Sequence, residues 1–276
     1  MIELLITVTI IATLLGLLMP ALSSAKTEGT KAKCLTNLRS LGQAFEAYGS
    51  DDESGLSAPV HPFAETKWWY DGEYEWGGKT GLGVYGPSGP AGSSWDLREE
   101  NRILNRYIFG VDNKVPSGLF ECPSDMGVSS APYNFDDYFL RPFSINKKLH
   151  EVTGTSYRLN NHIDFTGRTT FTKHFYGPYM RPKSRIPESA KTVILEEAVA
   201  EVAKWNSPNY VTMGWHRRAN SFSVSFIDGH AGSIHLAGQN EALSASTGYW
   251  ILRGEQWRMD CYPERRILDR PRADEP

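Results

Sequence analysis

The sequence predicts an α+β protein in which a long amino-terminal α-helix packs on an antiparallel β-sheet and large loop insertions enlarge the head. Three observations predict this class: an uncharged apolar run from Leu4 to Met19, an amphipathic repeat that continues to Tyr48, and short alternating segments bounded by Gly and Pro in the remainder. We therefore expect a helix over 1–50, a globular head over 51–264 and a solvated tail over 265–276.

Composition narrows the function classes. The chain has 276 residues, with 29 Lys and Arg against 32 Asp and Glu and a formal net charge of -3. No bulk positive field exists, which argues against a dedicated nucleic-acid-binding protein. A hydrophobic fraction of 40% excludes a disordered chain.

Residues 1–22 have the length and composition of a transmembrane helix. At 1.5 Å per residue they reach roughly 33 Å, which is enough for a hydrocarbon layer of ~30 Å. A cleaved secretory signal, an ordinary membrane anchor and an assembly helix all fit this pattern. The start of the chain has no basic residue, so the secretory signal is disfavoured.

Glu3 is the informative residue of this span. A carboxylate at the edge of an apolar helix is costly, so it either has a partner or snorkels into water. Basic residues follow the span and none precedes it: Lys26, Lys31, Lys33 and Arg39. The positive-inside rule would then place the head in the cytoplasm, unless a basic leader precedes Met1.

The pattern between Lys31 and Tyr48 predicts that the helix continues beyond the apolar span as an amphipathic helix over 23–50. Apolar residues recur at three- and four-residue spacing with polar residues between them: Leu35, Leu38, Leu41, Phe45 and Tyr48. This stripe should lie on the sheet. Gly49, followed by Ser50 and two aspartates, marks the end of the helix.

Several of these segments resemble one family. Met1-Ile-Glu-Leu-Leu, Pro20-Ala-Leu and Cys34 to Tyr48 resemble type IV pilin-like (pseudopilin) proteins, in particular the large prepilin-type N-terminal cleavage/methylation proteins. The resemblance implies a pilin-like fold and gives Glu3 the role of the assembly glutamate that neutralises the amino terminus of a neighbouring subunit. It makes Pro20 the residue that kinks or locally melts the helix.

In that family a short basic leader, a Gly and a methylated Phe precede the positions that match Met1 onward. We therefore expect the natural chain to begin upstream, with prepilin peptidase as a partner if that leader exists. The leader would supply the cytoplasmic positive charge, and the head would then be extracytoplasmic on a single-pass inner-membrane protein.

Within the head we expect short elements separated by turns. Lys67 to Trp76 is rich in aromatic residues, which indicates either a binding platform or, as we favour, a small core beneath a long loop. We expect a helix within Leu97–Ile108 and strands at Leu119–Asp125, Ser156–Asn161 and Ala190–Glu197. We also expect a β-hairpin, in which a half-buried strand within Ser221–His230 pairs with a second strand at Ala231–Leu236.

The block from His216 to His230 resembles the carboxy-terminal signature of the same family, a His followed by nine residues and then Asp-Gly-His. Here eleven residues separate His216 from Asp228, so a fixed geometry between the two does not carry over from the resemblance.

Imidazole and carboxylate groups at strand ends are suitable ligands for zinc, manganese or calcium. The candidates for a metal or hydrolytic site, or for a purely structural polar cluster, are Glu196, Glu197, His216, Asp228 and His230. If the cluster is purely structural, we expect Asp228 to cap the hairpin turn and His216 to hydrogen-bond a backbone carbonyl. No nucleophile motif occurs, so we predict no catalytic residues and no enzyme activity. We predict no cofactor, while the resemblance leaves calcium or another divalent metal open.

Cys34, Cys122 and Cys261 leave at least one cysteine unpaired within a monomer. One disulfide fits an extracytoplasmic head. Leu119–Asp125, like Cys34–Tyr48, resembles a segment of the same family. Because two of the three cysteines lie in these segments, the resemblance suggests a Cys34–Cys122 disulfide. A thiol role in the cytoplasm is the alternative.

The function that follows from the resemblance is structural. We expect a pseudopilin or minor pilin of a type II secretion or type IV pilus-like assembly, with other pilin subunits and the inner membrane as partners and no nucleic acid. The alternatives are a membrane-anchored, extracytoplasmic ligand- or metal-binding protein or hydrolase that uses the His216–His230 region, and an anchored domain that never polymerises.

Overall fold

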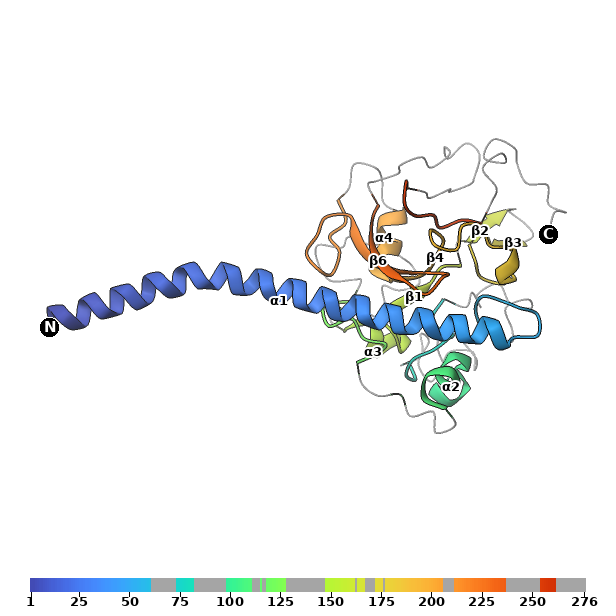
Figure 1. Ribbon diagram of the computed structural model, residues 1–276, viewed down its shortest axis with the longest axis horizontal. Coiled ribbons are helices and arrows are strands. Elements are labelled where there is room, and N and C mark those ends of the chain that lie inside the picture. The colour runs from blue at the N-terminus through green and yellow to red at the C-terminus, as the bar shows by residue number, and fades with distance from the viewer. Residues whose placement is uncertain are drawn as a thin grey trace.

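The computed structural model confirms the predicted class, with one long amino-terminal helix and a four-stranded antiparallel sheet (Figure 1). The described residues are 1–60, 73–81, 98–110, 115, 118–127, 147–161, 163–166, 172–175, 177–205, 211–236 and 254–261. Trp68 and Trp69 of the aromatic stretch and the tail predicted over 265–276 lie outside them.

Helix α1 runs from Ile2 to Asp51 without interruption. Its 50 residues correspond to about 75 Å of helix. Figure 1 shows that its amino-terminal half projects from the head as a gently curved rod. Pro20 lies inside the helix, so the chain neither ends nor melts there. The helix ends where Asp52 turns to an extended conformation and its N–H bonds the Tyr48 carbonyl.

The second half of α1 is the part that enters the head. Its buried residues confirm the predicted stripe, except that Leu35 is only half-buried. They are Cys34, Asn37, Leu38, Leu41, Gly42, Ala44, Phe45 and Tyr48. The Phe45 ring lies 5.2 Å from that of Trp76, and the Tyr48 ring lies 5.6 Å from that of Tyr107. Trp76 is therefore a core residue, as the small-core interpretation predicts.

The main sheet has the order β1-β4-β5-β6, with every neighbouring pair antiparallel. Its strands are β1 (Tyr157–Leu159), β4 (Val193–Glu197), β5 (Ser221–Phe226) and β6 (Ala231–His235). The predicted hairpin is confirmed, because β5 and β6 pair from Ser221↔His235 to Ser225↔Ala231. A separate antiparallel pair joins β2 (Ile163–Thr166) to β3 (Thr172–Phe175).

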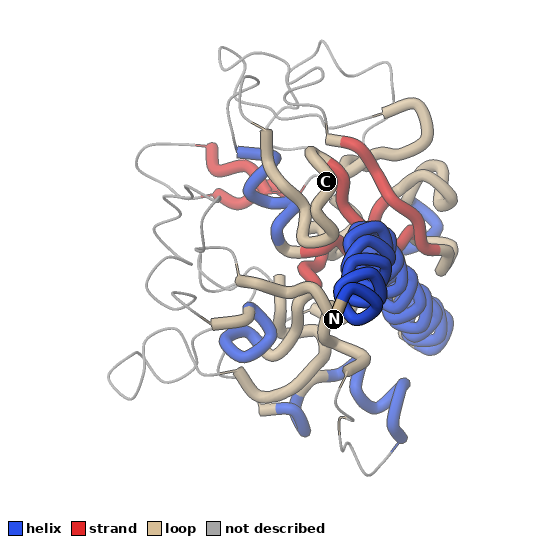
Figure 2. Tube along the Cα trace, turned by 90° about the vertical axis from the view of Figure 1, so that its left-hand side faces the viewer, coloured by secondary structure: helices blue, strands red, loops and turns tan. Residues whose placement is uncertain are grey.

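Both faces of the main sheet are covered, which corrects the expectation of a half-buried strand β5. Phe222 and Val224 are buried, and so are Ser223 and Ser225 between them. The serine face lies against α1, and Figure 2, viewed nearly along this helix, shows α1 directly against the strands. Helix α4 (Val199–Trp205) lies on the other side of the sheet. The small serine side chains allow the helix to approach closely.

The remaining elements are short. They are η2 (Glu99–Asn101), α2 (Ile103–Phe109), α3 (Leu149–Thr153) and η4 (Lys183–Arg185). The predicted helix near Leu97–Ile108 is thus a short 3-10 turn followed by α2, which packs on α1.

The strand predicted at Leu119–Asp125 is wrong, because the described part of this segment is a turn. The Asp125 N–H bonds the Cys122 carbonyl at 2.9 Å. The Asp125 carboxylate accepts hydrogen bonds from the backbone N–H groups of Gly127, Leu149 and His150 and from the Ser156 hydroxyl. Pro123 cannot donate a ladder hydrogen bond, and these donors hold the turn instead.

Arg102 and Glu75 are two buried ionisable side chains at the loop 73–81. The Arg102 guanidinium donates to three backbone carbonyls, of Tyr74, Gly77 and Thr153, at 2.6 to 2.9 Å. Burial lowers the pKa of Arg102 to about 10, against the opposing effect of Glu75. Burial raises the pKa of Glu75 from 4.5 to about 7. The carboxyl group therefore favours its neutral form in the folded protein.

This shift predicts a pH dependence of stability. A folded-state pKa above the unfolded value means that the folded protein binds the Glu75 proton more tightly. The contribution of Glu75 to stability is then largest below its unfolded pKa of 4.5 and is lost as the pH rises through about 7. Glu75→Gln should leave thermal stability almost unchanged at pH 4.5 and raise it at pH 8 by up to about 3 kcal/mol. Parallel pH profiles of the melting temperatures of the two full-length proteins would contradict this.

Candidate functional site

Two parts of the structure are candidates for function, and the first is the projecting half of α1. Every residue from Met1 to Lys26 is exposed. The exposed fractions of the large apolar side chains between Ile2 and Leu22 run from 51% to 78%. The apolar window of this helix has a mean hydropathy of 2.4 and none of it is buried. By length and composition α1 can cross a membrane.

Glu3 is the only charged side chain among the first 25 residues. The threonine hydroxyls of this span are satisfied within the helix: Thr7 donates to the Glu3 carbonyl at 2.8 Å, Thr9 to that of Leu5 at 2.7 Å and Thr13 to that of Thr9 at 2.8 Å. Apart from Glu3, the side chains of this span therefore present a uniformly apolar surface to their surroundings.

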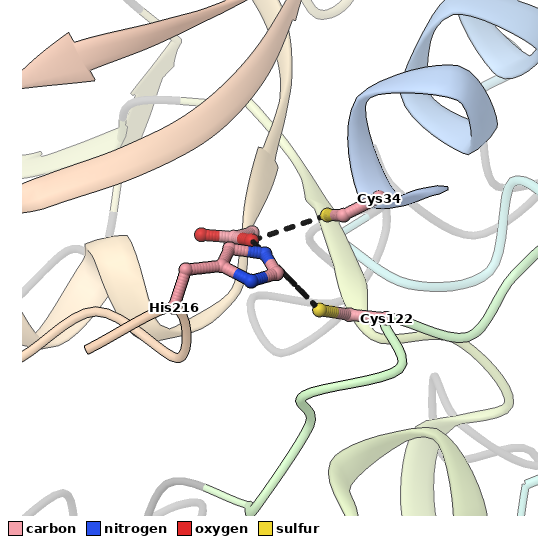
Figure 3. A group of neighbouring side chains, drawn as sticks. Cys34, Cys122 and His216 are labelled. Atoms are coloured by element: carbon pink, nitrogen blue, oxygen red, sulfur yellow. Dashed lines mark hydrogen bonds and ion pairs between the residues drawn. The ribbon is translucent and has the colours of Figure 1, made fainter. Parts of the chain in front are cut away.

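The second candidate is a buried group of four side chains where α1 meets the head, which we call the four-residue cluster. It consists of Cys34, Cys122, Glu197 and His216. Each comes from a different segment: Cys34 from α1, Cys122 from the Pro-containing turn, Glu197 from the end of β4, and His216 from the turn before β5. Figure 3 shows the two sulfur atoms and the imidazole directed towards one another.

The four side chains are close enough for direct interaction. One oxygen of Glu197, Oε1, lies 2.7 Å from His216 Nε2, 3.1 Å from Cys34 Sγ and 3.8 Å from Cys122 Sγ. Cys122 Sγ lies 3.6 Å from His216 Nε2. All four ligand atoms lie within 4.8 Å of one another. A single small ion could contact all of them.

Neighbouring groups hold the cluster in place. The Tyr157 hydroxyl donates to Cys34 Sγ at 3.5 Å, and the Ser223 N–H donates to the second Glu197 oxygen at 3.0 Å. Asn37, one turn after Cys34, donates to the Gly118 and Glu121 carbonyls and so ties α1 to the turn that carries Cys122.

The turn that carries His216 is closed by an antiparallel bridge between Met213 and Ala219. The neighbouring Trp215 indole donates to the Gly127 carbonyl at 3.2 Å. This contact joins the His216 turn to the segment of Cys122, so the histidine is positioned by both loops.

The cluster contains two neutral thiols and a basic imidazole. Burial, followed by Cys122 and the Glu197 carboxylate, raises the pKa of Cys34 well above 9.0. Burial is also the main cause that raises the pKa of Cys122. For His216, burial acts to lower the pKa, but hydrogen bonds with Cys34 and Glu197 outweigh it and raise the pKa to about 9.

These contacts argue against a thiol-dependent catalytic triad at this cluster. In such a triad one imidazole nitrogen faces the nucleophile and the other is held by the carboxylate. Here Nε2 of His216 faces both Cys122 and Glu197, while Nδ1 has no hydrogen-bond partner among the described residues. A reactive cysteine also needs a lowered pKa and access to solvent, whereas both thiols are buried.

The structure does not bring the five predicted polar residues into one site. Glu196 and Glu197 are successive residues of β4 and point to opposite faces of the sheet. Glu197 faces α1, whereas Glu196 pairs with Arg158 on the other face at 3.2 Å. His216 bonds the Glu197 carboxylate rather than a backbone carbonyl.

Asp228 and His230 lie in the exposed turn between β5 and β6, at the other end of β5 from His216. Asp228 accepts the His230 N–H, which is the turn-capping role predicted for it. The five candidate residues of the metal, hydrolytic or structural polar cluster therefore do not meet at a single site.

Cys34 and Cys122 lie side by side, and neither they nor Cys261 form a disulfide in this structure. The disulfide suggested for them is therefore not formed here. Sequence reasoning considered these cysteines only as a disulfide or as unpaired thiols, and it considered Glu197 and His216 apart from them. No short-range spacing links positions 34, 122, 197 and 216, so no sequence motif indicates the cluster.

Comparison with models of known protein families, with curated proteins and with solved structures finds no match for this chain.

Proposed function

We propose that this protein is a structural subunit of a pseudopilin or minor pilin type, anchored in the inner membrane and assembling laterally through the projecting half of α1. The observation that carries the proposal is the division of one continuous helix. Its amino-terminal half is apolar and wholly exposed, and its second half is seated in the core of the head.

The energetics support a role for the projecting half in contact with lipid or other helices. Large apolar side chains contribute ~1.5 to 3 kcal/mol each when they leave water. The 13 such residues from Ile2 to Leu22 thus represent on the order of 20 kcal/mol or more. A bilayer covers this surface before assembly, and neighbouring helices cover part of it in a filament. Because the second half of α1 is packed in the core of the head, the head moves together with the projecting half.

Glu3 provides the register between subunits in this proposal. Within an apolar bundle an unpaired carboxylate is strongly unfavourable, so a neighbouring amino terminus is favoured as its partner. A subunit that is displaced along the bundle loses this pair. Type II secretion and type IV pilus-like machines use this kind of lateral helix packing, which is why we place the protein in that class.

We expect Glu3→Ala to abolish incorporation into filaments while leaving the protein in the membrane. The test uses the full-length protein, expressed in its host and followed in sheared filament and membrane fractions by immunoblotting. Wild-type protein should appear in both fractions, and the Glu3→Ala variant only in the membrane.

Glu28→Ala is the matched control. Glu28 lies on the same helix, and its ion pair with Arg218 is half-exposed, so its loss should have little effect on stability. Normal incorporation of Glu3→Ala would exclude the proposed pairing. If wild-type protein is never found in a filament fraction, the anchored-domain alternative is favoured instead.

A further inference from the structure

We propose that the four-residue cluster is a binding site for one zinc ion, which fastens α1 to the head. The inference does not depend on whether the helix assembles into filaments, because it concerns the contact between the helix and its own head. It replaces the separate predictions of a Cys34–Cys122 disulfide and a His–carboxylate site.

The donor set selects the metal. Two thiols, one imidazole and one carboxylate are the ligand types that zinc takes in proteins. Calcium and magnesium prefer sites made of oxygen atoms alone, so paired sulfur atoms argue against both. Zinc would displace the two thiol protons and the proton of the ring nitrogen that binds it, and these protons leave to solvent.

The distances agree with a tetrahedral site. Metal–ligand bonds of about 2.0 to 2.3 Å imply tetrahedron edges of about 3.3 to 3.8 Å. The separations of Cys122 Sγ from His216 Nε2 and from Glu197 Oε1 are 3.6 and 3.8 Å, and that of Cys34 Sγ from Glu197 Oε1 is 3.1 Å. The Cys34–Glu197 contact of 3.1 Å and the His216–Glu197 hydrogen bond of 2.7 Å are shorter than these edges, so both must open, by roughly 0.2 and 0.6 Å.

Burial indicates a structural rather than a catalytic ion. All four residues are buried, so four protein ligands would complete the coordination and leave no open position for a substrate or water. The Tyr157 hydroxyl already contacts the Cys34 sulfur, and the Ser223 N–H bonds the other oxygen of the Glu197 carboxylate. Such outer contacts orient ligands and raise metal affinity.

The four-residue cluster lies at the point where α1 leaves the head, so it can fix the orientation of the projecting half relative to the head. Cys34 is the first buried residue of α1, directly after the exposed half. The other three ligands come from three separate segments of the head. An ion bound here would fix the direction in which the projecting half leaves the head, and the metal-free protein would allow the helix to loosen there first.

The experiment uses the full chain, purified in detergent under reducing conditions and stripped of metal. Titration with zinc should give one ion per chain by elemental analysis and raise the melting temperature. Titration with cobalt(II) in place of zinc should produce thiolate-to-cobalt charge-transfer bands and the visible absorption of tetrahedral coordination. Chelation should reverse each change.

Cys261 offers a matched control, because it is a buried cysteine outside the cluster. Cys122→Ala and His216→Ala should each weaken zinc binding by more than ~100-fold, whereas Cys261→Ala should bind zinc as the wild type does. Tyr157→Phe should keep the stoichiometry and lose about tenfold in affinity. The cobalt spectrum of the wild type remains decisive if a cysteine variant fails to fold.

Three results would overturn the inference. The first is a reduced wild-type protein that binds no zinc. The second is zinc binding that survives in both Cys122→Ala and His216→Ala. The third is a protein isolated with one titratable thiol after denaturation instead of three, and unable to bind zinc after reduction, which would favour a Cys34–Cys122 disulfide.

Discussion

Replacing Arg158 with Met should destabilise the protein by about 3 to 5 kcal/mol, because it leaves three carboxylates without their shared cation. Arg158 lies on β1 and donates to Glu196 of β4 at 3.2 Å and to Glu201 of α4 at 2.8 Å. Its other nitrogen bonds Glu73 and Asn161. The guanidinium thus joins two strands, a helix and the loop at 73–81.

The electrostatics explain why the loss is large. Burial alone would lower the pKa of Arg158, but Glu201, Glu73 and Glu196 outweigh it and raise the pKa well above its ordinary value. Only 6% of the Arg158 side chain and none of that of Glu196 is exposed. Water therefore cannot replace the cation when it is removed.

Denaturation of the full chain in detergent, followed by tryptophan fluorescence, measures the effect. Trp76 and Trp215 are both buried in the head and report its unfolding. Arg218→Met is the control, because the pair of Arg218 with Glu28 is about half-exposed and its loss should have little effect on stability. Equal effects of Arg158→Met and Arg218→Met would show that the buried network is not stabilising.

A second large effect is expected from Gly42→Leu, at about 2 to 3 kcal/mol of lost stability. A Cβ atom at position 42 would lie 2.3 Å from Ser225 Oγ, 3.2 Å from Gly229 Cα and 3.3 Å from Gly229 O. Ser225 can move its hydroxyl, but the backbone of the β5–β6 turn cannot easily withdraw from the helix. A larger side chain therefore separates α1 from the sheet.

Gly29→Leu on the same helix is the matched control. No heavy atom lies within 4 Å of a Cβ at Gly29, so this change should be neutral or stabilising by up to ~1 kcal/mol through helix propensity. Both variants are compared by thermal unfolding of the full chain. Gly42→Ala combined with Ser225→Ala should cost less than the two single changes added, because the nearest clashing atom is removed. Additive costs would contradict the close contact.

The contact between Gly42 and the β5–β6 turn also indicates what Asp228 and Gly229 do in this turn. Gly229 has a φ of 82°, a conformation that favours glycine, and its Cα faces the glycine of the helix. Asp228 caps the same turn. The Asp-Gly pair thus shapes the surface on which α1 lies, which is a structural role.

Local sequence patterns were sufficient to predict the helices and strands whose apolar residues recur at regular spacing. The apolar run before Met19, the stripe from Leu38 to Tyr48 and the β5–β6 hairpin were all predicted, because helical and strand periodicities depend on neighbouring residues alone. The Cys122-Pro turn was missed, because it is held by donors from Leu149, His150 and Ser156. Those partners are distant in sequence.

The candidate sites divide in the same way. The position and apolar character of the projecting helix, including the isolated charge of Glu3, can be read directly from consecutive residues. The four-residue cluster cannot, because α1, the turn at Cys122, β4 and the turn at His216 contribute one ligand each. Strand alternation separated Glu196 from Glu197, and the docking of α1 on the serine face of β5 brought Cys34 to Glu197. Side chains far apart in the chain meet only through packing, so tertiary structure alone decided which polar residues share a site.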